Sequence, residues 1–473
     1  MVRPDRVDPL AGASASGGSK RDNVAEAGGR RKQKEATPDD LDALVGRAKA
    51  VLDFNWTGEY TRPGPRLYPH QWSWDSAFIA LGYAHFDQER AMQELTHLFA
   101  NQWANGLLPQ IVFDQRSQHY FPGMDFWHAK CAPSAVCNHN TSGVVQPPLH
   151  ATAALAVYRR AVDRTAASEF LESVFPHLVA WHDYLYGERD PENEGLVYIR
   201  HPWESGMDNS PMWDPILLRM RLAPQEIPEY RRVDTQVVSA EDRPERAAYD
   251  RFAYLVRLFS ERDYDERRIR EDCPFLVQDV LFNALLCQGE QDLAEIARTL
   301  GEDPSPHDLR AHHTAAAMNG KLWDAEHETY LDFDLVENQP IRVYAAAGFL
   351  PLYAGVPDKG RAARMVESML QGGYALMATG IIPVPSYDPH GYGFSPSRYW
   401  RGPVWINIDW LLMRGLSRYG LEKEAERLSN TIIELVRRDG FYEYFDPFSG
   451  DGHGSDLFSW TAALFLDVVS DGR

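Results

Sequence analysis

The stretch Val277-Gln278-Asp279-Val280-Leu281-Phe282-Asn283-Ala284-Leu285 carries the clearest structural signal in the chain. Its apolar residues fall at positions i, i+3, i+4 and i+7, which is the spacing of one face of an α-helix. The same spacing recurs along the chain, separated by loops rich in Pro, Gly or aromatic residues. It predicts helices at about 38–52, 76–102, 147–163, 167–187, 243–261, 274–289, 290–301, 305–322, 341–353, 358–370, 402–419, 421–437 and 456–470.

Strand-like runs are few and short, at about 107–113, 196–200 and 381–385. Helices that follow one another without alternating strands indicate an all-α protein. If inner and outer helices pair and close into a ring, the fold is an (α/α)6 barrel. Long loops on such a scaffold commonly carry function. We expect the active site at one end of the ring, in the loops 68–75, 105–122, 141–150, 201–213, 397–405 and 441–454.

The chain has 473 residues, of which 44% are hydrophobic, so it can bury a large core. One large helical barrel or two domains would both fit this length. Residues 1–37 contain almost no large apolar side chain and cannot offset the entropy of ordering. We therefore predict a disordered N-terminal tail at 1–37 and a single catalytic barrel domain at 38–473.

The formal net charge is −20, from 48 basic and 68 acidic side chains. This balance argues against nucleic acid and anionic membrane surfaces as partners, because both are bound through Lys and Arg. The charge balance is more compatible with a small substrate that is neutral or weakly charged. No run reaches the roughly 20 apolar residues of a membrane span, and no signal-peptide core is visible, so we predict a cytoplasmic protein. Composition leaves open a monomer or a homo-oligomer.

We expect no metal and no cofactor. Cys131-x5-Cys137-x-His139 lacks the spacing of a zinc site. The loop Gly450-Asp451-Gly452-His453-Gly454 matches neither a phosphate-binding loop nor a calcium-binding loop.

The loop His201–Pro211 combines acidic, aromatic and chain-bending residues. A general acid must hold its proton near neutral pH, which requires burial or a neighbouring negative charge. Asp208 fits best, because Gly206 frees space before it and Asn209-Ser210-Pro211 forms a turn after it. Glu204 and Asp214 are other candidates. The alternative for Asp208 is a structural one, since Asp is also a preferred helix N-cap.

A second cluster, Phe441–Pro447, contains Glu443 in an aromatic strip. Two carboxyls that flank one bond are what glycoside hydrolysis requires, one as acid and one as base. Glu443 is the candidate base, with Asp446 and Asp456 as competitors. The alternative is a solvated surface glutamate.

The segments Tyr68–Asp75, Trp203–Pro211, Tyr399–Trp405 and Glu443-Tyr444 resemble the signatures of glycoside hydrolase family 63. Within that family the chain is most similar to small bacterial glucosylglycerate and mannosylglycerate hydrolases, from about Asp39 to Val469. The resemblance implies an (α/α)6 barrel and an inverting mechanism without metal. It assigns the general acid to Asp208 and the general base to Glu443.

The same resemblance implies a sugar pocket formed by Tyr68, Trp72, Trp74, Asp75, Gln146, Trp203, Gly206, Tyr399, Trp400 and Trp405. It places Arg243 and Tyr120 at the carboxylate of a glycerate group, since a guanidinium can hold a carboxylate with two hydrogen bonds. The alternative for Arg243 is a surface ion pair with Glu241 or Asp242.

We therefore expect an inverting α-glycosidase that acts on glucosylglycerate first and on mannosylglycerate next. Two departures bear on the leaving group: Gln110 stands where the family suggests His, and Leu457-Phe458 where it suggests a Gln pair. The alternative from another class is a sugar-binding protein on a hydrolase scaffold that no longer cuts.

Overall fold

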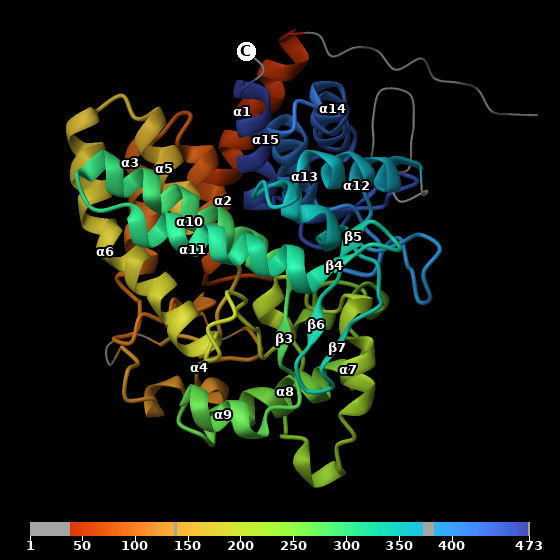
Figure 1. Cartoon of the computed structure of the whole chain (residues 1–473). Coiled ribbons are helices and arrows are strands. Elements are labelled where there is room, and N and C mark those ends of the chain that lie inside the picture. The colour runs from red at the N-terminus through yellow and green to blue at the C-terminus, as the bar shows by residue number, and fades with distance from the viewer. Residues whose placement is uncertain (1–37, 118, 137–139, 372–382, 472–473) are drawn as a thin grey trace, which may run out of the picture. The chain divides into compact units, whose positions relative to one another are not determined.

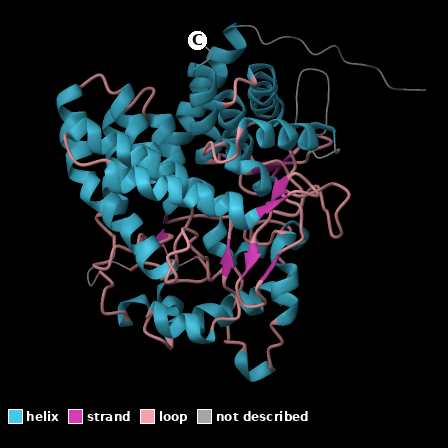
Figure 2. Ribbon diagram, viewed as in Figure 1, coloured by secondary structure: helices cyan, strands magenta, loops and turns pink. Residues whose placement is uncertain are grey.

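The structure is a computed structural model that describes residues 38–117, 119–136, 140–371 and 383–471. Asp42–Arg473 form the second of the two units into which the chain divides. The tail at 1–37, predicted to be disordered, lies outside the described residues, and the prediction of a single domain at 38–473 stays a prediction. Helices make up most of the second unit, as Figures 1 and 2 show.

Among the described residues, six helices form a closed inner ring in which each packs against the next and the last packs against the first. They bury most of their residues, and in the first of them every residue is buried. A helix that is apolar all round belongs in a core. The ring consists of α2 (Ser73–Tyr83), α5 (His150–Arg160), α10 (Val280–Leu300), the 3-10 helix η8 (Ala346–Leu352), α13 (Ile406–Arg418) and α15 (Ser459–Asp471).

An outer layer of helices packs against this ring. These helices bury one face only: α14, for example, buries Leu428, Ile432 and Val436 and exposes its charged residues. The layer consists of α1 (Pro38–Asn55), α3 (Gln88–Phe99), α6 (Arg164–Arg189), α11 (Ser305–Ala317), α12 (Lys359–Gln371) and α14 (Glu422–Asp439). The contact of α1 with the ring includes a hydrogen bond from the Tyr83 hydroxyl of α2 to the Leu52 carbonyl (3.2 Å). Paired inner and outer helices around a closed ring form the predicted all-α (α/α)6 barrel.

The long connection between α6 and α10 holds α7 (Asp214–Arg219), α8 (Arg246–Ser260) and α9 (Glu266–Asp272). Together with α4 (Met124–Trp127), which packs on α8, these helices lie at one end of the barrel in Figure 1. Single helical turns occur nearby: η1 (Ala129–Cys131), η2 (Pro202–Ser205), η3 (Pro211–Trp213), η4 (Pro224–Glu226), η5 (Asp234–Gln236) and η6 (Ala240–Asp242), and a π turn, η7 (Met318–Leu322), follows α11.

The strands that the structure describes are two residues long and antiparallel. Two of the pairs position loops of interest. In one, Trp72 lies opposite Ile111, just before the inner helix α2 begins; in the other, Tyr444 lies opposite His453, next to the candidate residue Glu443. The pairs are β1 (Gln71–Trp72) with β2 (Ile111–Val112), β3 (Val277–Gln278) with β6 (Phe333–Asp334), β6 with β7 (Gln339–Pro340), β4 (Trp323–Asp324) with β5 (Thr329–Tyr330), and β8 (Tyr444–Phe445) with β9 (Gly452–His453).

Two predicted helix boundaries are wrong. The helix predicted at 76–102 is split into α2 and α3, because the Asp87 carboxylate accepts a hydrogen bond from the Arg90 amide (3.1 Å) and starts a new helix. The two helices predicted at 274–289 and 290–301 are one helix, α10. It begins at Val280, so Val277 of the opening pattern lies in β3, and it continues through Gly289, where a Cβ would come within 2.8 Å of the His182 ring.

The predicted strands are longer than the strands and bridges that the structure contains at these positions. The run at 107–113 contains β2, and the run at 196–200 contributes one bridge, from Ile199 to Val277. In the run at 381–385, residues 381 and 382 lie outside the described residues, and Pro385 forms a bridge to Val404.

Asp467 of α15, whose side chain is almost fully buried, joins residues that belong to or follow the inner helices α2, α5 and α13. Its carboxylate accepts hydrogen bonds from His85 (2.8 Å), Arg160 (3.1 Å), Trp410 (2.8 Å) and Arg414. Burial alone would raise the pKa of Asp467, but these donors outweigh it and hold the pKa well below its usual range. We call this group the Asp467 cluster; its cations also face the negative ends of the helix dipoles.

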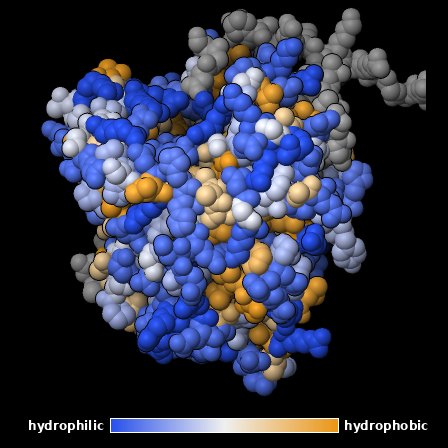
Figure 3. All heavy atoms as spheres, in the orientation of Figure 1, coloured by the Kyte–Doolittle hydropathy of each residue, from blue (hydrophilic) through white to orange (hydrophobic). Residues whose placement is uncertain are grey.

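The surface agrees with the composition. The face seen in Figure 3 is mostly hydrophilic, with scattered hydrophobic side chains. Within the described part of the chain, no helix is both long enough and apolar enough to cross a membrane.

Candidate active site

One cavity, with an empty volume of about 800 Å³ that is partly open to solvent, lies between the loops before α2, α5, α13 and α15 and the long connection from α6 to α10. It brings together both predicted catalytic carboxyls and nearly all predicted sugar-pocket residues. Those that line it are Tyr68, Trp72, Trp74, Asp75, Tyr120, Gln146, Trp203, Gly206, Asp208, Arg243, Tyr399, Trp400 and Glu443.

Trp405 is the exception. It lies behind Trp400, with the two rings stacked at 3.7 Å between centroids and 4° between planes. Its indole N–H donates to the Tyr399 carbonyl (3.1 Å). Trp405 therefore supports the cavity wall and does not line the cavity.

The Asp208 loop is shaped by its neighbours. Gly206 has a φ of +73°, and a Cβ there would lie 2.5 Å from the Trp74 ring, so the loop can approach that ring only with glycine. The N-cap of η3 is Ser210, whose hydroxyl accepts from the Met212 amide, so Asp208 is not the helix cap. Among the described residues, no other side chain donates a hydrogen bond to the Asp208 carboxyl, which is partly accessible from the cavity.

The environment of Asp208 favours its protonated form. Burial among apolar and aromatic walls is the main cause; Arg243 opposes it, and the negative charge of Glu443 adds to it. Together these effects raise the pKa of Asp208 to about 7. A carboxyl with this pKa holds a proton near neutral pH, as a general acid must.

Glu204, the other acid of this loop, has a structural place. It is fully buried and accepts hydrogen bonds from the Arg189 guanidinium (3.0 Å to each oxygen), from the Arg200 amide (2.7 Å) and from the Val145 amide (3.2 Å). Burial would raise the pKa of Glu204, but Arg189 and Arg200 outweigh it and keep the pKa below its usual value. Glu204 thus ties together the loops that carry Asp208 and Gln146.

Asp214, the third candidate acid, forms an ion pair with Arg401 (2.7 Å). It does not line the cavity.

Glu443 precedes β8 and is only 1% exposed, which excludes a solvated surface glutamate. The Tyr68 hydroxyl donates to its Oε1 (2.6 Å), and the Ser455 amide donates to its Oε2 (2.9 Å). Burial raises the pKa of Glu443 above its usual value, while Arg243, Tyr68 and Ser455 lower it. These three groups favour the ionised carboxylate that a general base needs.

Arg243 is 4% exposed, so it is not a surface arginine paired with Glu241 or Asp242. Its Nε donates to Asp234 (3.1 Å) and its Nη1 to the Tyr68 hydroxyl (3.1 Å). The same Nη1 lies 4.0 Å from Glu443, and the guanidinium stacks over the Tyr399 ring at 4.1 Å. Asp234 therefore fixes Arg243 at the cavity wall beside Glu443.

Asp75 and Gln146 add polar groups among the aromatic walls. Asp75 lies in the first turn of α2, and burial raises its pKa well above the usual range, with Glu443 and Asp208 adding to the effect. Gln146 accepts a hydrogen bond from the Trp74 amide (3.2 Å), which leaves its amide group free to donate.

Sequence reasoning missed several residues that line the cavity: Arg66, Leu67, His119, Phe121, Val233, Asp234, Val237, Tyr249 and Trp460. Trp460 did carry a signal, because it is an aromatic residue in the first turn of a predicted inner helix. Asp234 carried no such signal in the sequence, because its segment shows no regular apolar spacing. The two departures from the family also differ in position: Gln110 and Phe458 line the cavity, whereas Leu457 is partly exposed and does not.

Gly454 sets the position of Glu443. Its φ is +74°, and a Cβ there would lie 2.3 Å from the Glu443 Oε2. We expect Gly454→Ala to push the carboxylate aside and to lower kcat/KM by about 100-fold, as a displacement near 1 Å can do. Steady-state kinetics and a thermal unfolding curve would measure this.

Gly450→Ala is the matched control. Gly450 has the same φ of +74°, but its Cβ would meet the side chains of Arg438 (3.3 Å) and Leu435 (3.4 Å), neither of which lines the cavity. Equal losses of activity in the two variants would show that backbone strain, and not the position of Glu443, is responsible.

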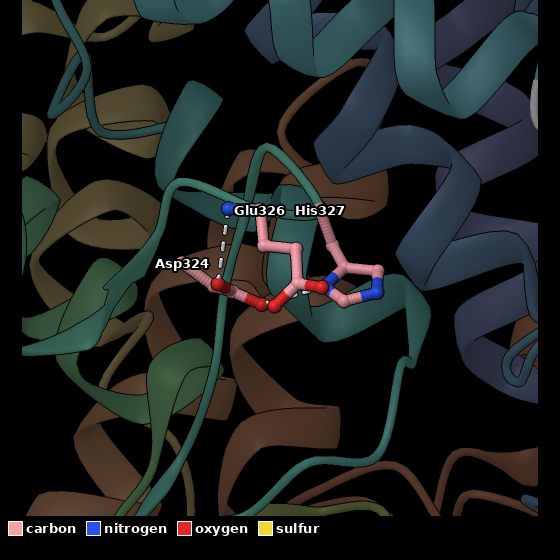
Figure 4. Close-up of side chains that lie close together, drawn as sticks. All are labelled: Asp324, Glu326 and His327. Carbon is pink, nitrogen blue, oxygen red and sulfur yellow. Dashed lines mark hydrogen bonds and ion pairs between the residues drawn. The ribbon is translucent and has the colours of Figure 1, made fainter.

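Asp324 at the end of β4 and Glu326 and His327 on the turn that follows lie close together (Figure 4) and could each offer one atom to a metal ion. The His327 Nδ1 already lies 2.9 Å from the Asp324 carboxylate and 2.7 Å from the Tyr344 hydroxyl. None of the three lines the cavity. Of the cysteine–histidine group considered above, Cys137 and His139 lie outside the described residues.

A helical barrel that holds two buried carboxyls and many aromatic rings in one cavity is typical of a glycoside hydrolase. The family model "Mannosylglycerate hydrolase MGH1-like glycoside hydrolase domain" matches residues 68–461. A relative named mannosylglycerate hydrolase, from Rubrobacter radiotolerans, is 63% identical over 93% of this chain and 100% of its own length. Another, named glucosylglycerate hydrolase, from Mycolicibacterium hassiacum, is 37% identical over 90% of this chain and 97% of its own length.

Among solved structures, the mannosylglycerate hydrolase of glycoside hydrolase family 63 from Thermus thermophilus, in complex with Tris and D-glycerate, superimposes with a TM-score of 0.84. It is 44% identical and covers 90% of this chain and 99% of its own. The chain belongs to the MGH1-like family within glycoside hydrolase family 63, and it is a glycoside hydrolase.

Proposed function

We propose that the chain is an inverting α-glycosidase that hydrolyses mannosylglycerate to mannose and glycerate. The observation that supports this most strongly is the arrangement of Asp208 and Glu443 in one aromatic cavity, with the buried guanidinium of Arg243 beside them. Aromatic faces suit the C–H faces of a sugar, and a guanidinium suits the carboxylate of glycerate.

In the proposed reaction, Asp208 donates its proton to the glycosidic oxygen as the bond from C1 to that oxygen breaks. Glu443 takes a proton from a water molecule, whose oxygen attacks C1 from the opposite face. The products are the free hexose with inverted configuration and the acid with its hydroxyl restored. Tyr68 and Ser455 hold Glu443 in place, and Gly206 brings the Asp208 loop against Trp74.

The order of the two substrates differs from the expectation drawn from the sequence, which favoured glucosylglycerate. The relatives that share 63% and 44% identity with the chain are named mannosylglycerate hydrolases, whereas the one named glucosylglycerate hydrolase shares 37%. Mannosylglycerate therefore takes first place, and glucosylglycerate is the second candidate.

The test is an assay for free hexose after incubation with mannosylglycerate, glucosylglycerate, trehalose and kojibiose. We expect the highest kcat/KM with mannosylglycerate, and NMR of the first product should show the inverted anomer. Higher kcat/KM with glucosylglycerate would reverse the order of the substrates. Tight binding without release of hexose from any of the four would favour the non-catalytic sugar-binding alternative.

The activity is expected to follow a bell-shaped pH profile that lies on the acidic side of neutrality. Asp208 must be protonated, so activity falls as the pH rises through its pKa of about 7. Glu443 must be ionised, so activity falls as the pH drops through a pKa that burial raises above the usual glutamate value. Because the two carboxyls interact, the two limbs belong to the pair. Rates measured across the pH range check this, and a plateau extending well above neutrality would contradict it.

A further inference from the structure

We propose that an acidic leaving group assists its own release through Arg243. When the carboxylate of the leaving group binds the Arg243 guanidinium, it neutralises that positive charge and thereby keeps Asp208 protonated in the complex. Arg243 then selects acidic aglycones through kcat as well as through binding. The inference rests on the proposed function, and it adds an electrostatic link between the leaving group and the general acid.

Arg243 is the buried positive charge in the lining of the cavity. Among the described residues that line the cavity, only Arg66 and Arg243 carry a permanent positive charge. The Arg66 side chain is 61% exposed and pairs with Asp456, so water screens its charge. Arg243 is buried, is held by Asp234, and lies 4.0 Å from Glu443. A buried charge acts on its neighbours far more strongly than an exposed one.

Few other charges face Asp208 near neutral pH. The titratable and charged groups that act on it or respond to it are Arg243, Glu443, Asp75, Tyr120, Tyr249 and Tyr399. Burial raises the pKa of the three tyrosines, which keeps them uncharged, and it also raises the pKa of Asp75 well above its usual range, which favours the neutral form. Among these groups, Arg243 is the one that carries a positive charge.

Asp234 also faces Arg243, but it is shared with Arg232, which donates to both of its carboxylate oxygens (3.0 and 2.5 Å). One carboxylate therefore faces two guanidinium groups, so the pair of arginines keeps a net positive charge. The positive charge of Arg243 lowers the pKa of Asp208 in the free enzyme. An aglycone carboxylate on Arg243 removes this effect, so Asp208 holds its proton to a higher pH in the complex.

The first experiment compares wild-type profiles for two substrates, mannosylglycerate and its uncharged glyceramide analogue. The profile of kcat/KM reports the free enzyme, and that of kcat reports the complex. For mannosylglycerate we expect the alkaline limb of kcat to lie about one pH unit above the alkaline limb of kcat/KM. For the glyceramide the two limbs should coincide. Coincident limbs for both substrates would overturn the inference.

The second experiment replaces the arginine. In Arg243→Gln, the alkaline limb of kcat/KM should move up by about one pH unit, and the two substrates should show the same profile. If Arg243 only anchored the carboxylate, the variant would raise KM for mannosylglycerate and leave the limb in place, which would overturn the inference. Arg66→Gln removes the same charge at a solvent-exposed position and should leave the alkaline limb unmoved.

The outcomes separate this inference from the proposed function. If neither glycoside is hydrolysed, the proposed function fails and the inference fails with it. If both are hydrolysed with coincident limbs, the inference alone fails. The comparison of the two substrates needs only the wild-type enzyme, so it remains decisive even if Arg243→Gln does not fold.

Discussion

Asp208→Asn is expected to lower kcat on mannosylglycerate by roughly 100- to 10,000-fold, because the leaving glycerate oxygen then departs without a proton. Asparagine keeps the shape of the side chain and is uncharged, like the protonated acid, so the fold and substrate binding should persist. Steady-state kinetics on mannosylglycerate and on α-mannosyl fluoride would measure the effect. Fluoride leaves without protonation, so the loss on that substrate should be much smaller.

Asp214→Asn is the matched control for this variant, since Asp214 belongs to the same region, pairs with Arg401 and does not line the cavity. It should retain near wild-type kcat. An equal loss on both substrates in Asp208→Asn would contradict a role for Asp208 as the proton donor.

Glu443→Gln is expected to lower kcat by a similar factor, roughly 100- to 10,000-fold, on both substrates, because the water molecule loses its base whatever the leaving group. The amide oxygen can still accept from the Tyr68 hydroxyl, so the local structure should hold. Kinetics would measure the loss, and calorimetry should show that the variant still binds mannosylglycerate.

Asp456→Asn controls for the loss of a carboxylate near the same loop, since Asp456 is partly exposed and pairs with Arg66. It should hydrolyse the substrate at close to the wild-type rate. Activity in Glu443→Gln that survives on the fluoride alone would show that Glu443 acts on the leaving group, contrary to the proposal.

The sequence predicted the fold well where helices show one apolar face or are apolar throughout. It failed where one residue decides a boundary. Phe86 continues the apolar pattern across the gap between α2 and α3, so the start of a new helix at Asp87 was missed. One predicted helix ended at Gly289, but this residue lies inside α10, where its backbone approaches the His182 ring, a contact that no local pattern reveals.

For the site, the sequence indicated which residues could do chemistry but not how their side chains are turned. Asp208 and Glu443 are far apart in the chain, and only the closed ring brings them into one cavity. Trp405 and Trp460 are both aromatic residues at the start of inner helices, yet only Trp460 lines the cavity. Asp234 meets Arg243 through a long irregular segment, whose path depends on contacts made after folding.

The Asp467 cluster and the cavity lie at opposite ends of the same inner helices, which has a consequence for how such a protein can change over generations. The loops at the cavity can acquire substitutions that suit another sugar or leaving group while the buried ion pairs at the far end continue to hold the ring together. Mutations that cost stability near the cavity can in turn be compensated at the far end, where no residue of the Asp467 cluster lines the cavity. This separation makes the barrel a tolerant starting point for directed evolution of new glycosidases.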